Sequence, residues 1–187
     1  MRITGGQFGG RIIKTPKGGD TRPTQDRVRE ALFSMLMEAV PGSRFLDLYA
    51  GTGAVGLEAL SRGASDVRWV ERDRATAALA AQNVAAIAGG DWSANVVVSD
   101  VDRWARTAPA AQPFEIVFAD PPYAEGRENG LMALAGVLLS RDLLVPGGLF
   151  ITEVPDDATV APIEGLSVVR DRTYGKSRIV VRQRGNP

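Results

Sequence analysis

Strand-like and helix-like segments alternate along most of this chain, and this alternation constrains its fold more than any other feature. Apolar stretches typical of buried strands occupy residues 44–50, 66–71, 95–100, 114–120 and 147–154, and helical apolar spacing marks residues 24–40, 54–63, 74–90 and 131–144. Residues 166–172 and 177–183 end the chain as a further pair of strands. Apolar strands that alternate with helices are typical of a mostly parallel sheet covered on both faces. We therefore predict an α/β, Rossmann-like, doubly wound seven-stranded sheet with a C-terminal antiparallel strand, and Thr24 as the N-cap of the first helix.

Composition narrows the chemistry that this fold can perform. The 187 residues are 44% hydrophobic and 24% charged, as in an ordinary globular protein, and include no Cys and no His. Disulfides, thiolate nucleophiles, imidazole bases and zinc sites built from Cys or His are therefore excluded, and we expect no metal. The chain has no apolar run of 18 residues, and its first residues lack the apolar core of a signal peptide. We expect a cytoplasmic protein without a membrane segment.

Charge is distributed unevenly, although the net charge is zero. Residues 1–30 carry a net charge of +4 and residues 170–187 carry +5, whereas residues 31–169 carry −9. Basic ends on an acidic body indicate a polyanionic partner, with an ordinary solvated surface as the alternative. We expect residues 1–20 to form a basic hairpin or arm that contacts RNA, and residues 21–187 to form the main domain. The expected substrate-binding residues in this basic region are Arg2, Arg11, Lys14, Lys17, Arg22, Arg27 and Arg29.

Four carboxylates fall at or near the predicted ends of successive strands: Asp47, Glu71, Asp100 and Asp120. Ligands of such sheets bind beyond the carboxyl ends of the strands. These residues are therefore candidates for one shared site. The alternatives are that Glu71 is a surface residue and that Asp100 caps the short helix predicted at residues 101–106.

The segment "DLYAGTGAVG", from Asp47 to Gly56, ends in the pattern G-x-G-x-x-G, and Glu71 follows Gly51 by 20 residues. This pattern is typical of dinucleotide sites, but Asp47 would repel the pyrophosphate of such a cofactor. S-adenosylmethionine has no phosphate, and its α-amino and sulfonium groups would be attracted by Asp47. We expect Glu71 to bind the ribose hydroxyls and Asp100 to lie near the adenine. The predicted cofactor-binding residues are Asp47, Tyr49, Ala50, Gly51, Thr52, Gly53, Glu71, Arg72, Asp100, Val101 and Asp120.

The fourth strand ends in Asp120-Pro121-Pro122-Tyr123. Two prolines fix the backbone and remove two N–H groups, so the turn is rigid and presents acceptors. Asp120 and the Pro121 carbonyl could accept both hydrogens of an amine on a flat base, and Tyr123 could stack on that base. We predict Asp120, Pro121, Pro122 and Tyr123 as the catalytic residues, with an ordinary turn at a strand end as the alternative.

The segments "DLYAGTG", "VERD", "VVVSD" and "DPPY" resemble, in this order, the class I S-adenosylmethionine-dependent amino-methyltransferases. The segments "RITGGQFGGR", "TRPTQDRVREALF", "LEALSRGA" and "YGKSRI" narrow the resemblance to the bacterial 16S ribosomal RNA guanine-N2 methyltransferases, and it spans nearly the whole chain. The resemblance implies methylation of the N2 amine of one guanine in 16S rRNA, with S-adenosylhomocysteine as the product. It also implies a monomer that acts on the small ribosomal subunit or on an assembly intermediate.

Other functions remain open at this point. The DPPY motif also suits an adenine-N6 methyltransferase acting on DNA or RNA, because both bases carry an exocyclic amine. A non-catalytic RNA-binding assembly factor with this fold is another alternative. A nicotinamide dehydrogenase is disfavoured by Asp47 and by the DPPY motif.

Overall fold

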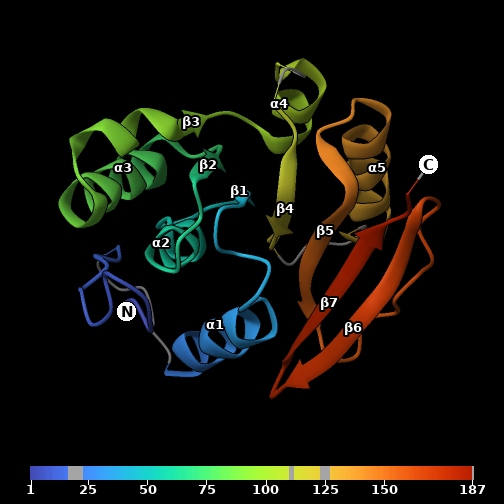
Figure 1. Ribbon diagram of the computed structural model, residues 1–187, viewed down its shortest axis with the longest axis horizontal. Coiled ribbons are helices and arrows are strands. Elements are labelled where there is room, and N and C mark those ends of the chain that lie inside the picture. Colours follow the sequence, from blue (N-terminus) through green and yellow to red (C-terminus); the bar gives the residue numbers. More distant parts are fainter. Residues whose placement is uncertain (17–22, 110–111, 123–126, 187) are drawn as a thin grey trace.

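A single mixed sheet organises the molecule, which is described here from a computed structural model for residues 1–16, 23–109, 112–122 and 127–186 (Figure 1). The strands lie in the order β3-β2-β1-β4-β5-β7-β6. Their bounds are β1 Arg44–Leu48, β2 Asp66–Glu71, β3 Val96–Val98, β4 Phe114–Ala119, β5 Leu144–Pro155, β6 Leu166–Tyr174 and β7 Ser177–Arg184. Strands β1 to β5 pair in parallel, whereas β7 is antiparallel to both β5 and β6. The predicted α/β sheet of seven strands is confirmed.

Helices cover both faces of this sheet. Their bounds are α1 Pro23–Met35, α2 Ala54–Ser61, α3 Arg74–Ala88, α4 Val101–Thr107 and α5 Arg127–Ser140, with a 3₁₀ helix, η1, at Gly90–Asn95. Buried residues of α1, α2 and α3 form one hydrophobic cluster, and those of α4 and α5 form a second. Alternate residues of β1 enter the two clusters, since Phe45 belongs to the first and Leu46 to the second. This alternation places the strands between two apolar layers, as expected for a doubly wound fold.

The crossovers change direction at β1. The chain passes from β1 to β2 and β3 on one side, and β4 and β5 lie on the other side. In open α/β sheets this reversal leaves a crevice at the carboxyl ends of the central strands, where ligands bind. The fold therefore locates the site at the ends of β1 and β4.

The first 16 residues, which belong to the expected hairpin or arm, pack against the domain. Arg2 and Ile12 form an antiparallel bridge, and the side chains of Ile3 and Ile13 join the hydrophobic cluster of α1, α2 and α3. Burial of these two isoleucines fastens a segment that is otherwise rich in glycine. The division of the chain near residue 20 remains a prediction.

Several element boundaries differ from those predicted. Helix α1 begins at Pro23, so Thr24 lies inside the helix and its prediction as the N-cap is wrong. Proline suits the first helical position because no intrahelical partner is needed there. Helix α5 ends at Ser140, and Asp142, with a left-handed φ of 50°, turns the chain toward β5. In the described parts of the chain, no helix is both long and apolar enough to cross a membrane.

Candidate active site

A cavity of about 360 Å³ opens at the carboxyl ends of β1 and β4. Its acidic wall includes Asp47 from β1, Asp120 directly after β4 and Glu153 from β5. The glycine loop contributes Tyr49, Ala50, Gly51 and Thr52. The remaining wall residues come from the N-terminus, α1, α2 and the sheet: Met1, Thr15, Pro16, Val28, Arg29, Leu32, Ala54, Val55, Phe118 and Ser177. The cavity thus combines carboxylates with closely approaching backbone.

Asp47 is a buried carboxylate at the base of the glycine loop. It is 1% exposed, and its Oδ2 accepts a 2.8 Å hydrogen bond from the amide of Gly56. Burial raises the pKa of Asp47 well above its ordinary value, the Gly56 hydrogen bond partly offsets this rise, and the charges of Asp120 and Glu71 add to it. Asp120 and Glu71 therefore lie close enough to Asp47 for their charges to act on it. A cation in the cavity would relieve this repulsion.

The glycine loop requires left-handed backbone and close packing. Tyr49, Gly51 and Gly53 have φ values of 60°, 54° and 80°, and Tyr49 adopts this conformation despite its side chain. A Cβ on Gly56 would lie 2.2 Å from the indole nitrogen of the buried Trp69, which donates a hydrogen bond to the Gly53 carbonyl. Hydrogen bonds to Asp47 of β1 and from Trp69 of β2 therefore hold the loop and the start of α2 in place.

Glu71 holds the glycine loop, whereas Asp100 caps a helix. The two oxygens of Glu71 accept hydrogen bonds from the amides of Gly51, at 3.0 Å, and Asp73, at 2.9 Å. Asp100 is the N-cap of α4 and accepts from the amide of Arg103 at 3.0 Å, which is the alternative that the sequence left open. Glu71, Arg72, Asp100 and Val101 lie outside the described cavity wall. Glu71 is connected to the cavity wall by its hydrogen bond from Gly51, which lines the cavity.

The rigid turn after β4 is described up to Pro122. Asp120 is half-buried and lines the cavity, Pro121 is buried and Pro122 is exposed. Tyr123 lies outside the described residues, as do Lys17 and Arg22. The structure thus brings Asp120 to the same cavity as Asp47 and the glycine loop, and a role for Tyr123 stays a prediction.

The basic residues expected to contact substrate divide into two groups. Arg2, Arg11, Lys14 and Arg27 are exposed. Arg29 is buried, and its guanidinium pairs with Glu58 at 3.2 Å and with Asp26 at 3.0 Å. Arg29 also donates to the Arg2 carbonyl. These internal contacts give no support to the expectation that Arg29 binds RNA, although its side chain lines the cavity.

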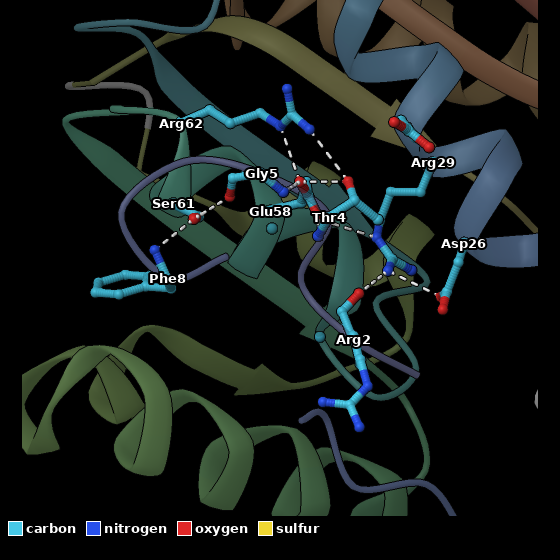
Figure 2. A network of polar contacts seen from close by, with 12 residues as sticks. Arg2, Thr4, Gly5, Phe8, Asp26, Arg29, Glu58, Ser61 and Arg62 are labelled. Carbon is cyan, nitrogen blue, oxygen red and sulfur yellow. Dashed lines mark hydrogen bonds and ion pairs between the residues drawn. The ribbon is translucent and has the colours of Figure 1, made fainter. Parts of the chain in front are cut away.

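Glu58 is one of the residues that sequence reasoning missed. It is a fully buried carboxylate of α2 that accepts hydrogen bonds from Thr4, Gly5, Arg29 and Arg62 (Figure 2). Burial alone would raise its pKa, but the hydrogen bonds from Thr4 and Arg62 and the charge of Arg29 outweigh burial and lower it. A charged residue within the apolar run "AVGLEALS" was the available signal. Glu153 and Ser177 of the cavity wall were also missed.

The order of the seven strands and the glycine loop after the central strand define the class I, Rossmann-like methyltransferase fold. Among the described residues, no group of acidic side chains is arranged to hold a metal ion. The chain belongs to the family described as "Conserved hypothetical protein 95", which matches residues 1–183.

Relatives and solved structures agree with this assignment. The chain is 42% identical over 126 residues to "Ribosomal RNA small subunit methyltransferase D" of Escherichia coli (strain K12), a match that covers 67% of this chain and 62% of that relative. It is 32% identical over 177 residues to the protein of the same name from Haemophilus influenzae, covering 94% of this chain and 89% of the relative. The structure of "Putative methyltransferase yhhF from Escherichia coli" superposes with a TM-score of 0.85 at 33% identity, covering 100% and 99% of the two chains.

Proposed function

We propose that this protein transfers a methyl group from S-adenosylmethionine to the exocyclic N2 amine of one guanine in 16S rRNA of the small ribosomal subunit. The observation that carries the proposal is that Asp47 and Asp120 line one cavity at the ends of neighbouring strands. One carboxylate is available for a cationic cofactor and the other for an amine. Family membership and the methyltransferase fold support the same reaction.

The residues of the cavity fit S-adenosylmethionine. The acidic wall suits the α-amino and sulfonium cations, and the buried Asp47 loses part of its electrostatic penalty when a cation lies nearby. Gly51, which lines the cavity, lets the backbone approach a ligand closely. Each carboxylate oxygen of Glu71 retains acceptor capacity beside its one backbone hydrogen bond, so it can also bind ribose hydroxyls. When bound, the cofactor supplies an electrophilic methyl group on its sulfonium.

Asp120 would position the amine that is methylated. The exocyclic nitrogen of guanine is a poor nucleophile because its lone pair is conjugated with the ring. Acceptance of its hydrogens by Asp120 and the Pro121 carbonyl would free this lone pair, and Pro121-Pro122 would keep both acceptors rigid. The chain has no His or Cys, so positioning is the main catalytic device available to it. We assign the stacking of the base to Tyr123.

The names of the curated relatives support an rRNA substrate in the small subunit. Guanine N2 lies on the base-pairing edge, so the target base would have to be unpaired or flipped out of its helix. The exposed cations Arg2, Arg11, Lys14 and Arg27 are suited to the surrounding phosphates. We propose action as a monomer in the cytoplasm, on the small subunit or on one of its assembly intermediates.

A methylation assay with isolated components tests the proposal. Small subunits and free 16S rRNA from cells that lack this gene would be incubated with the protein and labelled S-adenosylmethionine, followed by nucleoside analysis. Formation of N2-methylguanosine at a single site supports the proposal. Formation of N6-methyladenosine would instead show that the protein is an adenine-N6 methyltransferase. Absence of methyl transfer to either substrate would favour a non-catalytic assembly factor. Asp120→Ala is the matched variant that separates enzyme activity from contamination.

A further inference from the structure

The N-terminal segment, residues 1–16, forms one side of the cavity together with α1. Met1, Thr15 and Pro16 line the cavity from this segment, and Val28, Arg29 and Leu32 line it from α1. The position of both elements therefore sets the shape of the site. Neither element belongs to the sheet; both pack against it through the hydrophobic cluster that includes Ile3, Ile13 and the buried residues of α1, and a polar contact adds to this packing.

Glu58 supplies that contact. Its carboxylate accepts from the Thr4 amide at 2.8 Å, from the Thr4 hydroxyl at 2.7 Å and from the Gly5 amide at 2.9 Å. It also accepts from Nε of Arg29 at 3.2 Å and from Nε of Arg62 at 2.8 Å (Figure 2). Glu58 lies on α2, the helix that begins directly after the glycine loop. A single carboxylate thus connects the loop helix to the N-terminal segment and to α1.

Arg29 completes the connection between the two wall elements. Its guanidinium donates to Glu58, to Asp26 on α1 and to the backbone carbonyl of Arg2 in the N-terminal segment (Figure 2). Asn83 of α3 makes a second link, because its amide donates to the carbonyls of both Lys14 and Thr52. Thr52 lies in the glycine loop. One side chain thus links the N-terminal segment to the loop that lines the cavity.

Packing alone does not require a carboxylate at this position. The other helical residues of α2 are apolar or small, and replacing a buried ion pair with apolar residues is often neutral or stabilising. Three of the five hydrogen bonds to Glu58 come from the N-terminal segment, and a fourth comes from α1. We propose that Glu58 is a positioning residue that holds the N-terminal segment and α1 in place as the wall shared by cofactor and RNA. This inference rests on the proposed methyl transfer.

The inference has a kinetic signature. Glu58 lines no part of the described cavity, and no described contact joins it to Asp47 or Asp120. Its loss should therefore loosen binding without disturbing the groups that act on the amine. We expect Glu58→Gln to raise KM for both S-adenosylmethionine and RNA by about tenfold, with kcat at saturation within about threefold of the wild type. The matched control is Glu115→Gln, because Glu115 accepts the Arg44 amide at the opposite end of β4.

Hydrogen exchange measured by mass spectrometry gives a readout that does not depend on turnover. Without ligand, the peptide that contains Thr4 and Gly5 should exchange faster in Glu58→Gln than in the wild type. S-adenosylmethionine should slow its exchange in the wild type and much less in Glu58→Gln. Glu115→Gln should behave as the wild type in both measurements. A role confined to fold stability would raise exchange across the domain and would not alter the response of this one peptide to the cofactor.

Thr4→Val decides the question if Glu58→Gln does not fold. It removes the hydrogen bond that the Thr4 hydroxyl donates to Glu58 and the one that it accepts from Arg62, and leaves the carboxylate with its other donors. A raised KM with kcat retained in either folded variant supports the positioning role. Unchanged KM in folded Glu58→Gln, or in Thr4→Val where Glu58→Gln is unfolded, would overturn it, as would loss of kcat alone. An inactive wild type would instead disprove the proposed methyl transfer. The effect of S-adenosylmethionine on hydrogen exchange of the Thr4–Gly5 peptide would still test whether Glu58 holds the cavity wall.

Discussion

The amide of Gly56 donates a 2.8 Å hydrogen bond to the carboxylate of Asp47, which is 1% exposed. This one bond does not compensate for burial, and the pKa of Asp47 is well above its ordinary value near 3.8. The folded protein therefore binds a proton at Asp47 more tightly than the unfolded chain does. The free energy of unfolding should decrease as the pH rises from 3.8 through the raised pKa of Asp47.

Asp47→Asn should consequently raise the thermal stability of the ligand-free protein at neutral pH. An Asn side chain can still accept from Gly56 but carries no buried charge. The gain in Tm should shrink as the pH falls toward 4, where Asp47 of the wild type is protonated. The same variant should bind S-adenosylmethionine more weakly. Scanning calorimetry across this pH range and binding calorimetry check both outcomes, and a lower Tm at pH 7 would contradict the first.

Glu71→Gln tests the proposed ribose contact. Loss of hydrogen bonds to a charged acceptor, about 1.5–3 kcal/mol each, should raise the Kd for S-adenosylmethionine by at least about tenfold. Asp73→Asn is the matched control. Asp73 follows Glu71 by two residues and is the N-cap of α3, and Asn is an equally good N-cap residue. Isothermal titration calorimetry measures both variants. Equal affinity of Glu71→Gln and the wild type would remove Glu71 from the site.

Asp120→Ala should reduce methyl transfer by about 100-fold or more, because the amine loses the group that positions it. Cofactor affinity should remain close to that of the wild type. The measurement is single-turnover methyl transfer with saturating RNA, combined with cofactor binding on the same protein sample. A wild-type rate would show that Asp120 has no part in the reaction.

Gly56→Ala should destabilise the domain by about 1–3 kcal/mol, since its Cβ would lie 2.2 Å from the indole nitrogen of the buried Trp69 and one of the two would have to shift. Gly136→Ala is the control on another helix, α5, where a Cβ meets nothing within 4 Å. It should leave stability unchanged or raise it by up to about 1 kcal/mol. Chemical denaturation gives both values. A mild effect of Gly56→Ala would mean that α2 can move away from β2.

Glu58 should contribute to acid sensitivity with the opposite sign from Asp47. Its pKa is lowered from 4.5, so its contribution to stability is present above that value and is lost as the pH falls through the lowered pKa. The stability difference between the wild type and Glu58→Gln should therefore narrow at low pH. Urea unfolding at a series of pH values measures it. A difference that stays constant down to pH 3 would show that the charge of Glu58 is unimportant.

Sequence reasoning succeeded for elements whose apolar residues recur at regular spacing, and it failed for contacts between residues that are far apart in the sequence. Strand ends could be located from apolar runs, so the positions of Asp47, Glu71 and Asp120 followed from the topology of a parallel sheet. Packing of residues 1–16 was not predictable from composition, because Ile3 and Ile13 lie in a segment of glycines and polar residues that has no regular apolar spacing. Glu58 was missed because its partner Thr4 is 54 residues away. No local pattern carries that pairing.

The long separation between these partners has a consequence for biosynthesis. Residues 1–16 leave the ribosome before α2 and α3, yet they hydrogen-bond to Glu58 and to Asn83, which lies 69 residues after Lys14. These residues must therefore remain undocked until α2 and α3 have been made. Because contacts of high sequence separation form against a larger loop-closure entropy, the cavity wall should be completed late in folding. A segment that is synthesised before its partners is then among the last to reach its place.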